Sequence, residues 1–549
     1  MIWPTEQDTI TSAFKRACRE YQELPLLVVP ANPNRDYYPA GYELSYTAAE
    51  SAVEELISHY RRAGYGLGHR VGLFLDNRPE HLLHKLALNC IGACCVPVNP
   101  DYRSSELAYL IDHSKLDLVV VRPSRLDQLS VALASTSSQP GVVNFTSFGT
   151  EIPAARRKPD HGQVQPETPA SILYTSGTTG RPKGCVLSHG YELAAGAWYV
   201  SRGGEAEIRT GKERLYNPLP LYHVNASVLS FYAMLLSGGC QIQSERFQPS
   251  RWWIEIAESR ATIVHYLGVI VPMLLSQPTT PADRAHSVRF GIGAGVEPQL
   301  HSAFEERFGF PLIEIWGMTE IVRLLVDNVA PRNVGTRAFG RPVPGLEVKV
   351  ICDDGQEAEH GSSGELLVRH SEAEPRKHFF SGYLDDPEAT ERAWRGGWFH
   401  TGDVVSQNKE GMLFFVDRLK NIIRRSGENI AAAEVEAMLL THPLVAQAAV
   451  LAVRDDIREE EVLACITLDP ALDASKSMDK ALRSEFATQI FEYCSKHLAY
   501  YKAPGWILFM PEIPKTGTQK VQKHRIFSPE IDPRDHPEIV DLRTLKKRS

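Results

Sequence analysis

Strand-like and helix-like segments alternate along the first third of the chain, and this alternation restricts the folds open to it. Apolar runs at 70–75, 94–98 and 116–121 have the length and composition of buried strands. Segments with helical periodicity at 80–90 and 106–113 separate them. Strands that alternate with helices form crossover units around a mostly parallel sheet. The sequence therefore predicts an α/β fold.

The length of 549 residues is more than one hydrophobic core normally holds, so we expect at least two domains. Gly-rich turns and short strands follow the α/β part, and a polar turn separates them from a further series of helices and strands. We predict an N-terminal domain at 1–416 with a β-rich subdomain at about 335–416, a hinge at 417–421, a C-terminal α+β domain at 422–530 and a loosely held polar tail at 531–549.

Composition excludes several classes of protein. The net charge of −8 argues against nucleic acid as a partner, because nucleic-acid binding needs a basic face. No apolar run is long enough for a membrane span, and the N-terminus lacks the pattern of a secretory signal. The nine cysteines, with Cys90, Cys94 and Cys95 in an apolar setting, lack the paired spacings of disulfide or metal sites. We expect buried reduced thiols and a cytoplasmic protein.

A loop at 174–184 carries the densest chemical signal, with the sequence YTSGTTGRPKG. Glycines let the backbone N–H groups approach a ligand, hydroxyls donate hydrogen bonds, and a lysine adds a point charge. The spacing is not that of the common nucleotide loop, because Pro182 precedes the lysine and Gly184 follows it. The residues expected to bind phosphate are Thr175, Ser176, Gly177, Thr178, Thr179, Gly180 and Lys183.

This loop resembles the signature loop of the adenylate-forming (ANL) superfamily, which includes acyl-CoA synthetases, peptide-synthetase adenylation domains and beetle luciferases. Five further segments are similar to the superfamily's motifs and come in the same order, at 217–225, 291–295, 314–320, 398–403 and 514–520. The resemblance covers nearly the whole chain. It implies a large N-terminal domain of parallel and mixed sheets flanked by helices, with a smaller mobile α+β C-terminal domain.

The resemblance also implies the ligands ATP (leaving AMP), Mg²⁺ and CoA, and a role for each matching residue. The catalytic set is His223 beside the acyl carboxylate, Thr319 at the α-phosphate, Glu320 as the Mg²⁺ ligand, and Lys520. The adenine and ribose set is Gly293, Ala294, Gly295, Glu314, Ile315, Trp316, Gly317, Met318, Asp403 and Arg418. Rotation of the C-terminal domain about Lys420 would exchange Lys520 for the Gly427 loop, which faces the CoA thiol.

The residue types suit adenylation on physical grounds. A carboxylate that attacks a phosphate joins two anions, so the site must supply positive charge, here from Lys520 and an ion on Glu320. The sequence departs from the superfamily at two positions. Trp316 stands where a stacking tyrosine is usual, and Gln519 stands where glycine is usual before Lys520. Stacking survives the first change, and the second alters the loop's backbone freedom.

The pocket segment favours the acyl-CoA synthetase branch. Tyr222-His223 replaces the Phe-Asp of amino-acid-activating members, so no carboxylate there would pair with a substrate ammonium. The expected pocket residues mix polar and apolar character, and include Asn225, His265, Leu267, Ile321 and Arg323. They indicate a short or medium acid, with Arg323 a candidate for contacting a second carboxylate. The resemblance is nearest to crotonobetaine/carnitine-CoA ligases.

Three alternatives stay open at this point. An aromatic acid would make the chain an aryl-CoA ligase. A carrier-protein thiol could replace CoA as the acceptor. A degenerate site would make the chain a binding or regulatory protein, although Glu320, Asp403 and Lys520 are all present. Monomer and homodimer are equally compatible with the sequence.

Overall fold

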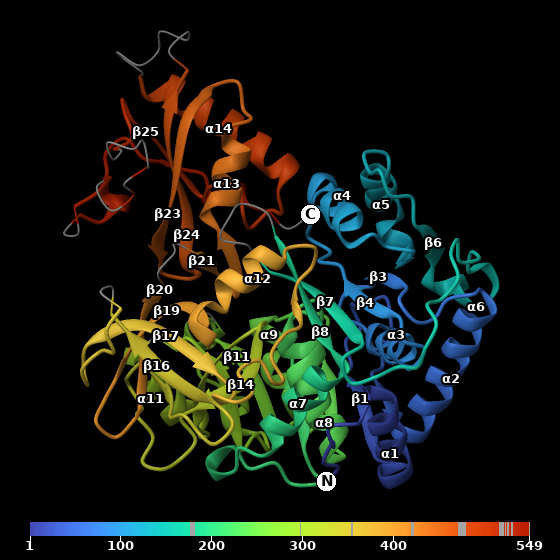
Figure 1. Cartoon of the computed structure of the whole chain (residues 1–549). Coiled ribbons are helices and arrows are strands. Elements are labelled where there is room, and N and C mark those ends of the chain that lie inside the picture. Colours follow the sequence, from blue (N-terminus) through green and yellow to red (C-terminus); the bar gives the residue numbers. More distant parts are fainter. Residues whose placement is uncertain are drawn as a thin grey trace.

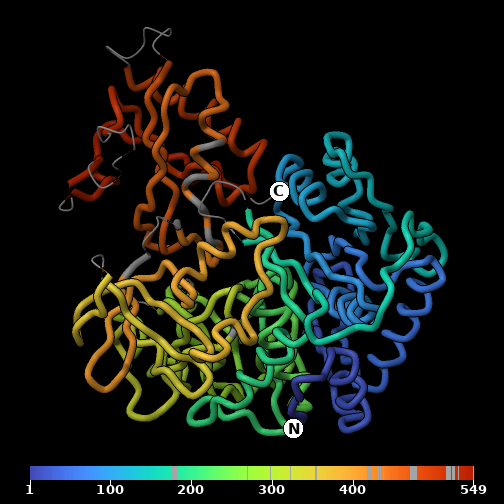
Figure 2. The backbone as a smooth tube through the Cα atoms, viewed as in Figure 1, coloured from blue at the N-terminus to red at the C-terminus, as the bar shows by residue number. Residues whose placement is uncertain are grey.

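The computed structural model has two parts, each with its own hydrophobic core (Figure 1). It describes residues 1–175, 182–268, 270–296, 298–352, 355–418, 422–469, 479–514, 521, 523, 526–528 and 531–547. The largest core cluster draws its residues from 10–413, and the second from 423–542. In Figure 2 the orange and red C-terminal part stands above the rest and meets it along one side. Among the described residues, every helix is too short or too polar to cross a membrane.

A seven-stranded sheet carries the phosphate loop. Its order is β18-β8-β7-β4-β3-β5-β6, parallel from β7 to β6, with β8 and β18 antiparallel at one edge. Its strands are β3 (Arg70–Phe74), β4 (Cys94–Pro97), β5 (Leu118–Val121), β6 (Gly141–Asn144), β7 (Pro169–Thr175), β8 (Lys183–Ser188) and β18 (Gly382–Tyr383). The loop at 176–181 lies between β7 and β8, so its flanking residues Thr175 and Lys183 are paired across the strands.

An eight-stranded sheet carries the adenine and acyl motifs. Its order is β14-β13-β12-β11-β9-β10-β1-β2, parallel from β13 to β1 with antiparallel strands at both edges. Its strands are β1 (Pro25–Val29), β2 (Tyr42–Ser45), β9 (Arg214–Asn217), β10 (Cys240–Gln243), β11 (Ile263–Leu267), β12 (Phe290–Ala294), β13 (Leu312–Met318) and β14 (Ile321–Val326). Parallel strands bring their carboxyl ends to one edge, which is where ligands bind in such sheets.

A five-stranded antiparallel sheet supplies Asp403. Its order is β15-β20-β19-β17-β16, from β15 (Ala338–Gly340), β16 (Glu347–Ile351), β17 (Ser363–Arg369), β19 (Phe399–Gln407) and β20 (Leu413–Arg418). This is the β-rich region expected over 335–416. One strand of this region lies elsewhere than expected, because β18 joins the edge of the seven-stranded sheet beside β8.

The C-terminal part is a sheet of the order β22-β21-β24-β25-β26, with β23 also paired to β24. Its strands are β21 (Ile422–Arg425), β22 (Glu428–Ala431), β23 (Val445–Asp455), β24 (Glu459–Leu468), β25 (Trp506–Phe509) and β26 (Val540–Asp541). The expectation of a loosely held tail is wrong. Within the tail, β26 pairs with β25, and the Lys546 ammonium is buried against Glu461 at 2.6 Å.

Helices pack on the sheets and between them (Figure 1). Many start with a recognisable signal: Ser45 caps α2, Ser188 caps α7, Asp479 caps α14, and proline opens α3 and α9. The helices are α1 (Ile10–Tyr21), α2 (Tyr46–Arg62), α3 (Pro79–Cys90), α4 (Ser104–Ser114), α5 (Leu126–Leu133), α6 (Phe148–Glu151), α7 (His189–Val200), α8 (Phe231–Ser237), α9 (Pro249–Glu258), α10 (Ile270–Leu275), α11 (Pro298–Phe308), α12 (Pro387–Ala393), α13 (Ala432–Leu439) and α14 (Lys480–His497).

The α/β class and the mixed-sheet, two-part architecture predicted from the sequence are confirmed. The strands expected at 70–75, 94–98 and 116–121 are β3, β4 and β5, and the helices expected at 80–90 and 106–113 are α3 and α4. All nine cysteines are free thiols and seven are buried, as expected. The exact domain limits stay predictions, and Leu419, Lys420 and Asn421 of the expected hinge lie outside the described residues.

Candidate active site

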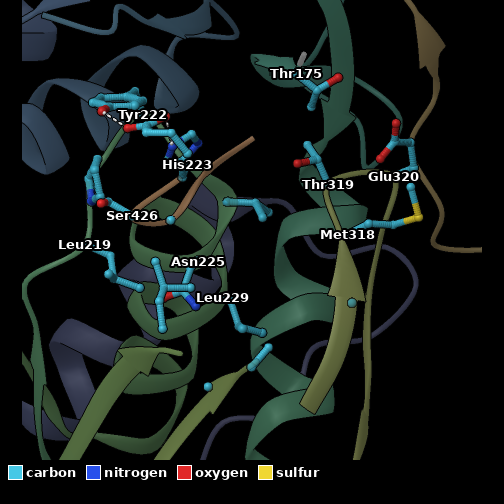
Figure 3. Close-up of a pocket in the computed structure, with 18 of the residues that line it drawn as sticks. Thr175, Leu219, Tyr222, His223, Asn225, Leu229, Met318, Thr319, Glu320 and Ser426 are labelled. Carbon is cyan, nitrogen blue, oxygen red and sulfur yellow. Dashed lines mark hydrogen bonds and ion pairs between the residues drawn. The ribbon is translucent and has the colours of Figure 1, made fainter. Parts of the chain in front are cut away.

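A cavity of about 1140 Å³ lies where the strand ends of the three N-terminal sheets meet the C-terminal part. Its wall includes the ends of β7, β11, β12 and β13, part of β19, and the turn between β21 and β22. Figure 3 shows its two sides, with Thr175, Thr319 and Glu320 facing Tyr222, His223 and Asn225 across the open space. Nearly all the segments expected to bind nucleotide and acid therefore meet in one place.

One end of the cavity gathers the groups expected to meet phosphates. Thr175 and Lys183 flank the phosphate loop, and the Lys183 ammonium lies 4.6 Å from the centre of the Tyr383 ring. The Tyr383 hydroxyl donates to Glu320 Oε1 at 2.8 Å. Burial, with the nearby Glu320 charge, raises the pKa of Tyr383 far above its usual value, so this hydroxyl stays protonated as a donor. Tyr383 thus fixes the orientation of the Glu320 carboxylate.

Asp403 on β19 faces the same cavity and is mostly buried. Its Oδ2 accepts a hydrogen bond from Trp316 Nε1 at 2.9 Å. Trp316 is itself buried, and its side chain is not part of the cavity wall within the described chain. The indole that occupies the usual stacking position here holds the expected ribose-binding carboxylate. Arg418, the last residue of β20, pairs with Asp403 in the strand register.

The glycine loop after β12 is held by a buried carboxylate. Glu314 on β13 accepts hydrogen bonds from the Tyr266 hydroxyl at 2.6 Å and from Gly295 N at 2.9 Å. Burial raises the pKa of Glu314 to about 7, against the opposing effect of these bonds. Gly293 has no room for a side chain, because a Cβ would lie 2.2 Å from the Tyr266 carbonyl oxygen. Glu314 therefore holds the glycine loop through its hydrogen bond to Gly295 N and is not itself part of the cavity wall.

The end of the cavity that is expected to hold the acid is built on a π-helical turn at Asn225–Ser230, a rare conformation that is common at functional sites. Asn217 Oδ1 accepts a hydrogen bond from Leu219 N. The other side-chain atom, Asn217 Nδ2, therefore faces Asn225 and donates to Asn225 Oδ1 at 3.0 Å. His265 Nδ1 also contacts Asn225 Oδ1, at 2.7 Å. The Asn225 oxygen is therefore turned into the protein, and its Nδ2 has no partner among the described residues. Asn225 lines the cavity beside Leu229 (Figure 3).

The C-terminal part contributes the tight turn of the β21–β22 hairpin, Arg425 to Glu428. Tyr222 donates its hydroxyl to Glu428 Oε1 at 2.9 Å, and His223 Nε2 lies 3.4 Å from Glu428 Oε2. Burial alone would raise the pKa of Glu428, but His223 and Tyr222 outweigh it and the pKa is lowered. Gly427 at φ +84° fits against Leu267, where a Cβ would lie 2.3 Å from Leu267 Cδ1.

A buried cation fixes this orientation of the two parts. The Lys502 ammonium donates to Glu106 of α4 and to Glu434 of α13, both at 2.7 Å. Burial favours the neutral lysine, but the two carboxylates outweigh it and raise the pKa of Lys502. Hydrogen bonds between uncharged groups lie near Lys502, Glu106 and Glu434. One of them runs from Asn99 Nδ2 to the Tyr501 hydroxyl at 3.0 Å.

The structure brings together most of the predicted site residues that it describes. The cavity wall includes Thr175, Lys183, His223, Gly293, Ala294, Ile315, Gly317, Met318, Thr319, Glu320, Asp403 and Gly427. Gly295, Glu314 and Trp316 stand behind this wall with the contacts given above. Ser176, Gly177, Thr178, Thr179, Gly180, Lys420 and Lys520 lie outside the described residues.

Arg323 is not part of the wall of this cavity. The expectation that it could contact a second carboxylate there is not supported, because its guanidinium bonds to Gly345 and Lys377 carbonyls away from that wall. Two residues of the site were missed from sequence. Tyr383 has no motif of its own and is brought to Glu320 only by β18, whereas Glu428 could have been recognised from its position beside Gly427.

Comparisons with known proteins agree with this geometry. The AMP-binding enzyme family model matches residues 14–384, and the model of the AMP-binding enzyme C-terminal domain matches residues 434–520. A sulfoacetate–CoA ligase of Cupriavidus necator is 30% identical over 96% of this chain and 98% of its own length. A crotonobetaine/carnitine–CoA ligase of Proteus mirabilis is 29% identical over 88% of this chain and 93% of its own.

Solved structures show the same fold. A double mutant of o-succinylbenzoate CoA synthetase from Bacillus subtilis, bound with the product analogue OSB-NCoA, has a TM-score of 0.79, with 21% identity over 94% of this chain and 98% of that chain. The same synthetase in complex with the acyl-adenylate intermediate OSB-AMP has a TM-score of 0.65, with 22% identity over 95% and 98%. The chain belongs to the AMP-binding enzyme family, in the acyl-CoA ligase branch of the adenylate-forming superfamily.

Proposed function

We propose that this ATP-dependent acyl-CoA ligase acts on a small carboxylic acid that carries an oxygen acceptor away from its carboxylate. In the first step a carboxylate oxygen attacks the α-phosphorus of ATP and pyrophosphate leaves. In the second step the CoA sulfur attacks the acyl carbon and AMP leaves. The observation that carries the assignment is the convergence of Thr175, Lys183, Thr319, Glu320 and Asp403 on one cavity that the C-terminal hairpin also enters.

The residues present fit a magnesium ion shared with the substrate. Mg²⁺ is usually held by one or two carboxylates together with phosphate oxygens. Within the described chain there is no cluster of three acidic, His or Cys side chains for an all-protein metal site. Glu320, oriented by Tyr383 at the phosphate end, is the residue we assign to the ion. The ion would supply positive charge to the phosphates, while Thr319 and Lys183 bind their oxygens.

The observed domain orientation fits the second step. Glu428 and Gly427 of the hairpin occupy the side of the cavity next to His223, where a thiol must meet the acyl carbon. The residues that flank the expected catalytic loop, Ile513 and Val521, pack instead in the core of the C-terminal part. The higher TM-score against the CoA-analogue complex than against the acyl-adenylate complex supports this orientation. Rotation would bring Lys520 in for the first step.

Asn225 carries the proposal about the acid. Its carbonyl oxygen is committed to Asn217 and His265, so its Nδ2–H groups are presented to the acyl end of the cavity. Burial lowers the pKa of His265 to about 3, so His265 is neutral and serves only to hold the amide. An alkyl chain would leave these donors unpaired at a cost of about 1–3 kcal/mol. An acid with a carbonyl, hydroxyl or sulfonate oxygen at this place would satisfy them.

Both curated relatives have names that indicate compact polar acids, sulfoacetate and crotonobetaine or carnitine. This supports a polar acid for the present chain. A sulfonate or β-oxygen suits the Asn225 donors, whereas a quaternary ammonium would not use them. The class we favour is therefore a small acid with an oxygen acceptor and not a long fatty acid.

The acid is tested with matched substrates and a matched variant. We expect kcat/KM for acetoacetate to exceed that for butyrate, and Asn225→Leu to lower the acetoacetate value about 10- to 100-fold, from the loss of about 1–3 kcal/mol of hydrogen bonding. The butyrate value should change little. Leu229→Met, on the same wall, serves as the control. An unchanged ratio of the two acids in Asn225→Leu would refute the proposed acid class and leave the ligase assignment intact.

The two-step assignment has its own test. Lys520→Ala should strongly reduce pyrophosphate release from acid and ATP while leaving thioester formation from supplied acyl-adenylate and CoA nearly intact. If acyl-adenylate forms but CoA yields no thioester, the acceptor is another thiol. Equal loss of both half-reactions would contradict the two-orientation mechanism.

A further inference from the structure

The polar tail of the chain carries a buried lysine that neither half-reaction proposed above uses. The side chain of Lys546 is fully buried. Its ammonium donates to Glu461 Oε1 at 2.6 Å and to the Tyr501 carbonyl at 3.0 Å. The backbone of the tail brings it there, because β26 pairs with β25 and Leu542 N donates to the Gly505 carbonyl at 2.8 Å. Lys546 therefore connects the tail to β24 and to the segment around Tyr501.

The contact with Glu461 leads to the turn of the β21–β22 hairpin. Glu461 lies on β24, and its side chain is fully buried. Its Oε1 also accepts a hydrogen bond from Val462 N at 2.8 Å, and its Oε2 accepts one from Arg425 Nε at 2.7 Å. Arg425 is the first residue of the turn that continues to Glu428, and only 1% of its side chain is exposed. The carboxylate that anchors the hairpin is therefore oriented on its other oxygen by the tail.

The contact with Tyr501 leads to a second place where the C-terminal part meets the N-terminal part. The Tyr501 hydroxyl accepts a hydrogen bond from Asn99, and the next residue, Lys502, bonds to Glu106. Tyr501 and the hairpin residues 425–428 all line the active-site cavity. The tail lysine therefore joins two C-terminal segments that form this side of the cavity and contact the N-terminal part.

This cluster places two cations around one carboxylate, and all three side chains are buried. Burial, together with the charges of Arg425 and Arg458, lowers the pKa of Lys546 to about 7, although Glu461 opposes the shift. Arg425 Nη1 has no hydrogen-bond partner in the part of the chain that the structure describes. Buried ion pairs often add little stability over apolar residues of the same volume, but in some proteins they fix one arrangement of the chain. A positional role explains why charged groups stand here.

We propose that Lys546 is a positioning residue for thioester formation. Through Glu461 it fixes the hairpin turn, and through the Tyr501 carbonyl it fixes the neighbouring segment, so that both face the incoming thiol in one arrangement. The inference rests on the two-orientation mechanism proposed above. In the orientation for adenylation the hairpin leaves the cavity, so the first half-reaction does not depend on Lys546. The tail lies outside the segments at 14–384 and 434–520 that match the family, and it nevertheless supports the acceptor side of the site.

The test measures the two half-reactions of the full-length protein separately. Pyrophosphate release is followed with acetoacetate and ATP, and thioester formation is followed with acetoacetyl-adenylate and CoA. In Lys546→Met we expect the maximal rate of thioester formation to fall about tenfold, because the Tyr501 carbonyl and one Glu461 oxygen lose a buried donor. Pyrophosphate release and the KM for ATP should stay unchanged. Equal loss of both half-reactions would indicate a structural role alone and would overturn the proposal.

A second cation of the tail provides the matched control. Arg543 pairs with Asp455 and Asp541, and none of these three residues lines the cavity. Arg543→Met should therefore change neither half-reaction. Because Lys546 acts through the hairpin, the thioester loss in the double variant of Lys546→Met and Arg425→Met should be smaller than the product of the two single losses. Single losses that simply multiply would overturn the proposal.

The outcomes also separate this inference from the proposed function. Unchanged thioester formation in Lys546→Met would overturn the inference alone. A wild type that forms no thioester with CoA would refute the proposed acceptor and the inference with it. If Lys546→Met does not fold, Glu461→Gln, which keeps the shape of the side chain, is judged by the same difference between the half-reactions.

Discussion

Two buried lysines in this molecule both pair with buried carboxylates, but one pair lies inside a single core and the other lies between the two parts of the chain. Lys85 lies inside the N-terminal core, where its ammonium donates to both oxygens of Glu192 at 2.7 and 2.8 Å and to Ser171, with neither charged side chain exposed. Lys502 is as deeply buried, but its two carboxylates come from different parts of the chain. The first lysine joins segments of one core, whereas the second joins two surfaces that part in each cycle of the proposed two-orientation mechanism.

The difference shows where buried charge is useful. Apolar residues of similar volume can often replace an ion pair in a permanent core without loss of stability. At an interface that opens, each ion regains its hydration on separation, so the pair resists opening less than an apolar patch of the same area would. Lys502 can therefore specify one domain orientation without locking it. Its partner Glu106 shows the strain of this arrangement, because burial raises the pKa of its carboxyl despite the ammonium.

The largest expected effect is on the permanent pair. Glu192→Gln leaves the Lys85 ammonium buried without a counter-charge, and we expect the free energy of unfolding of the N-terminal part to fall by about 3–5 kcal/mol. Urea denaturation followed by tryptophan fluorescence measures it. Replacing both partners, as Lys85→Met with Glu192→Leu, should restore most of the loss. Glu55→Gln, at an exposed carboxylate, is the control. A loss below about 1 kcal/mol would remove the contrast between the two lysines.

The second effect is kinetic and specific to one half-reaction. Lys502→Met leaves the carboxylates of Glu106 and Glu434 facing each other whenever the domains adopt the observed orientation. We expect thioester formation from supplied acyl-adenylate to slow about 10- to 100-fold, which is about 1.4–2.8 kcal/mol, with pyrophosphate release unchanged. Lys496→Met, an exposed position on α14, should affect neither. If both half-reactions slow together, Lys502 is a structural residue like Lys85 and the comparison fails.

The smallest effect concerns a third buried lysine. Lys546 contacts Glu461, which also binds Arg425, and burial lowers the pKa of Lys546 to about 7. Between this value and the ordinary pKa of about 10.5, the unfolded chain holds the proton that the folded chain has released. The free energy of unfolding of the C-terminal part should therefore rise with pH, by about 1 kcal/mol from pH 7 to pH 8. Denaturation at each pH, compared with Lys546→Met, isolates the effect. Parallel pH curves for the two proteins would contradict it.

The sequence was most informative where local pattern decides structure. Apolar runs and helical periodicity located β3, β4, β5, α3 and α4, and motif order placed Thr175, Glu320 and Asp403 at one cavity. Pattern could not predict features that depend on distant partners. The direction of Arg323 and the contact of Tyr383 with Glu320 depend on how separate segments pack.

Two further features could not be predicted from the sequence, because they also depend on contacts between residues that pack together only in the folded chain. The tail after residue 530 is polar in composition, which indicates loose attachment, yet Lys546 is fixed by the buried Glu461. The orientation of the Asn225 amide follows from a relay through Asn217 and Leu219 N, and no spacing in the sequence encodes it. The sequence shows that Trp316 departs from the usual tyrosine, but its hydrogen bond to Asp403 depends on the packing of β13 against β19 and has no local pattern.

The β21–β22 hairpin affects how many ATP molecules the reaction consumes for each thioester that it makes. An acyl-adenylate is a reactive mixed anhydride, and water that reaches it wastes one ATP for each molecule hydrolysed. With Gly427 fitted against Leu267 and Glu428 bonded to Tyr222, the hairpin covers one side of the cavity in which that intermediate would lie. A closed site excludes water from such intermediates. The number of ATP molecules consumed per thioester made is therefore set by how tightly this turn closes as well as by the chemistry beneath it.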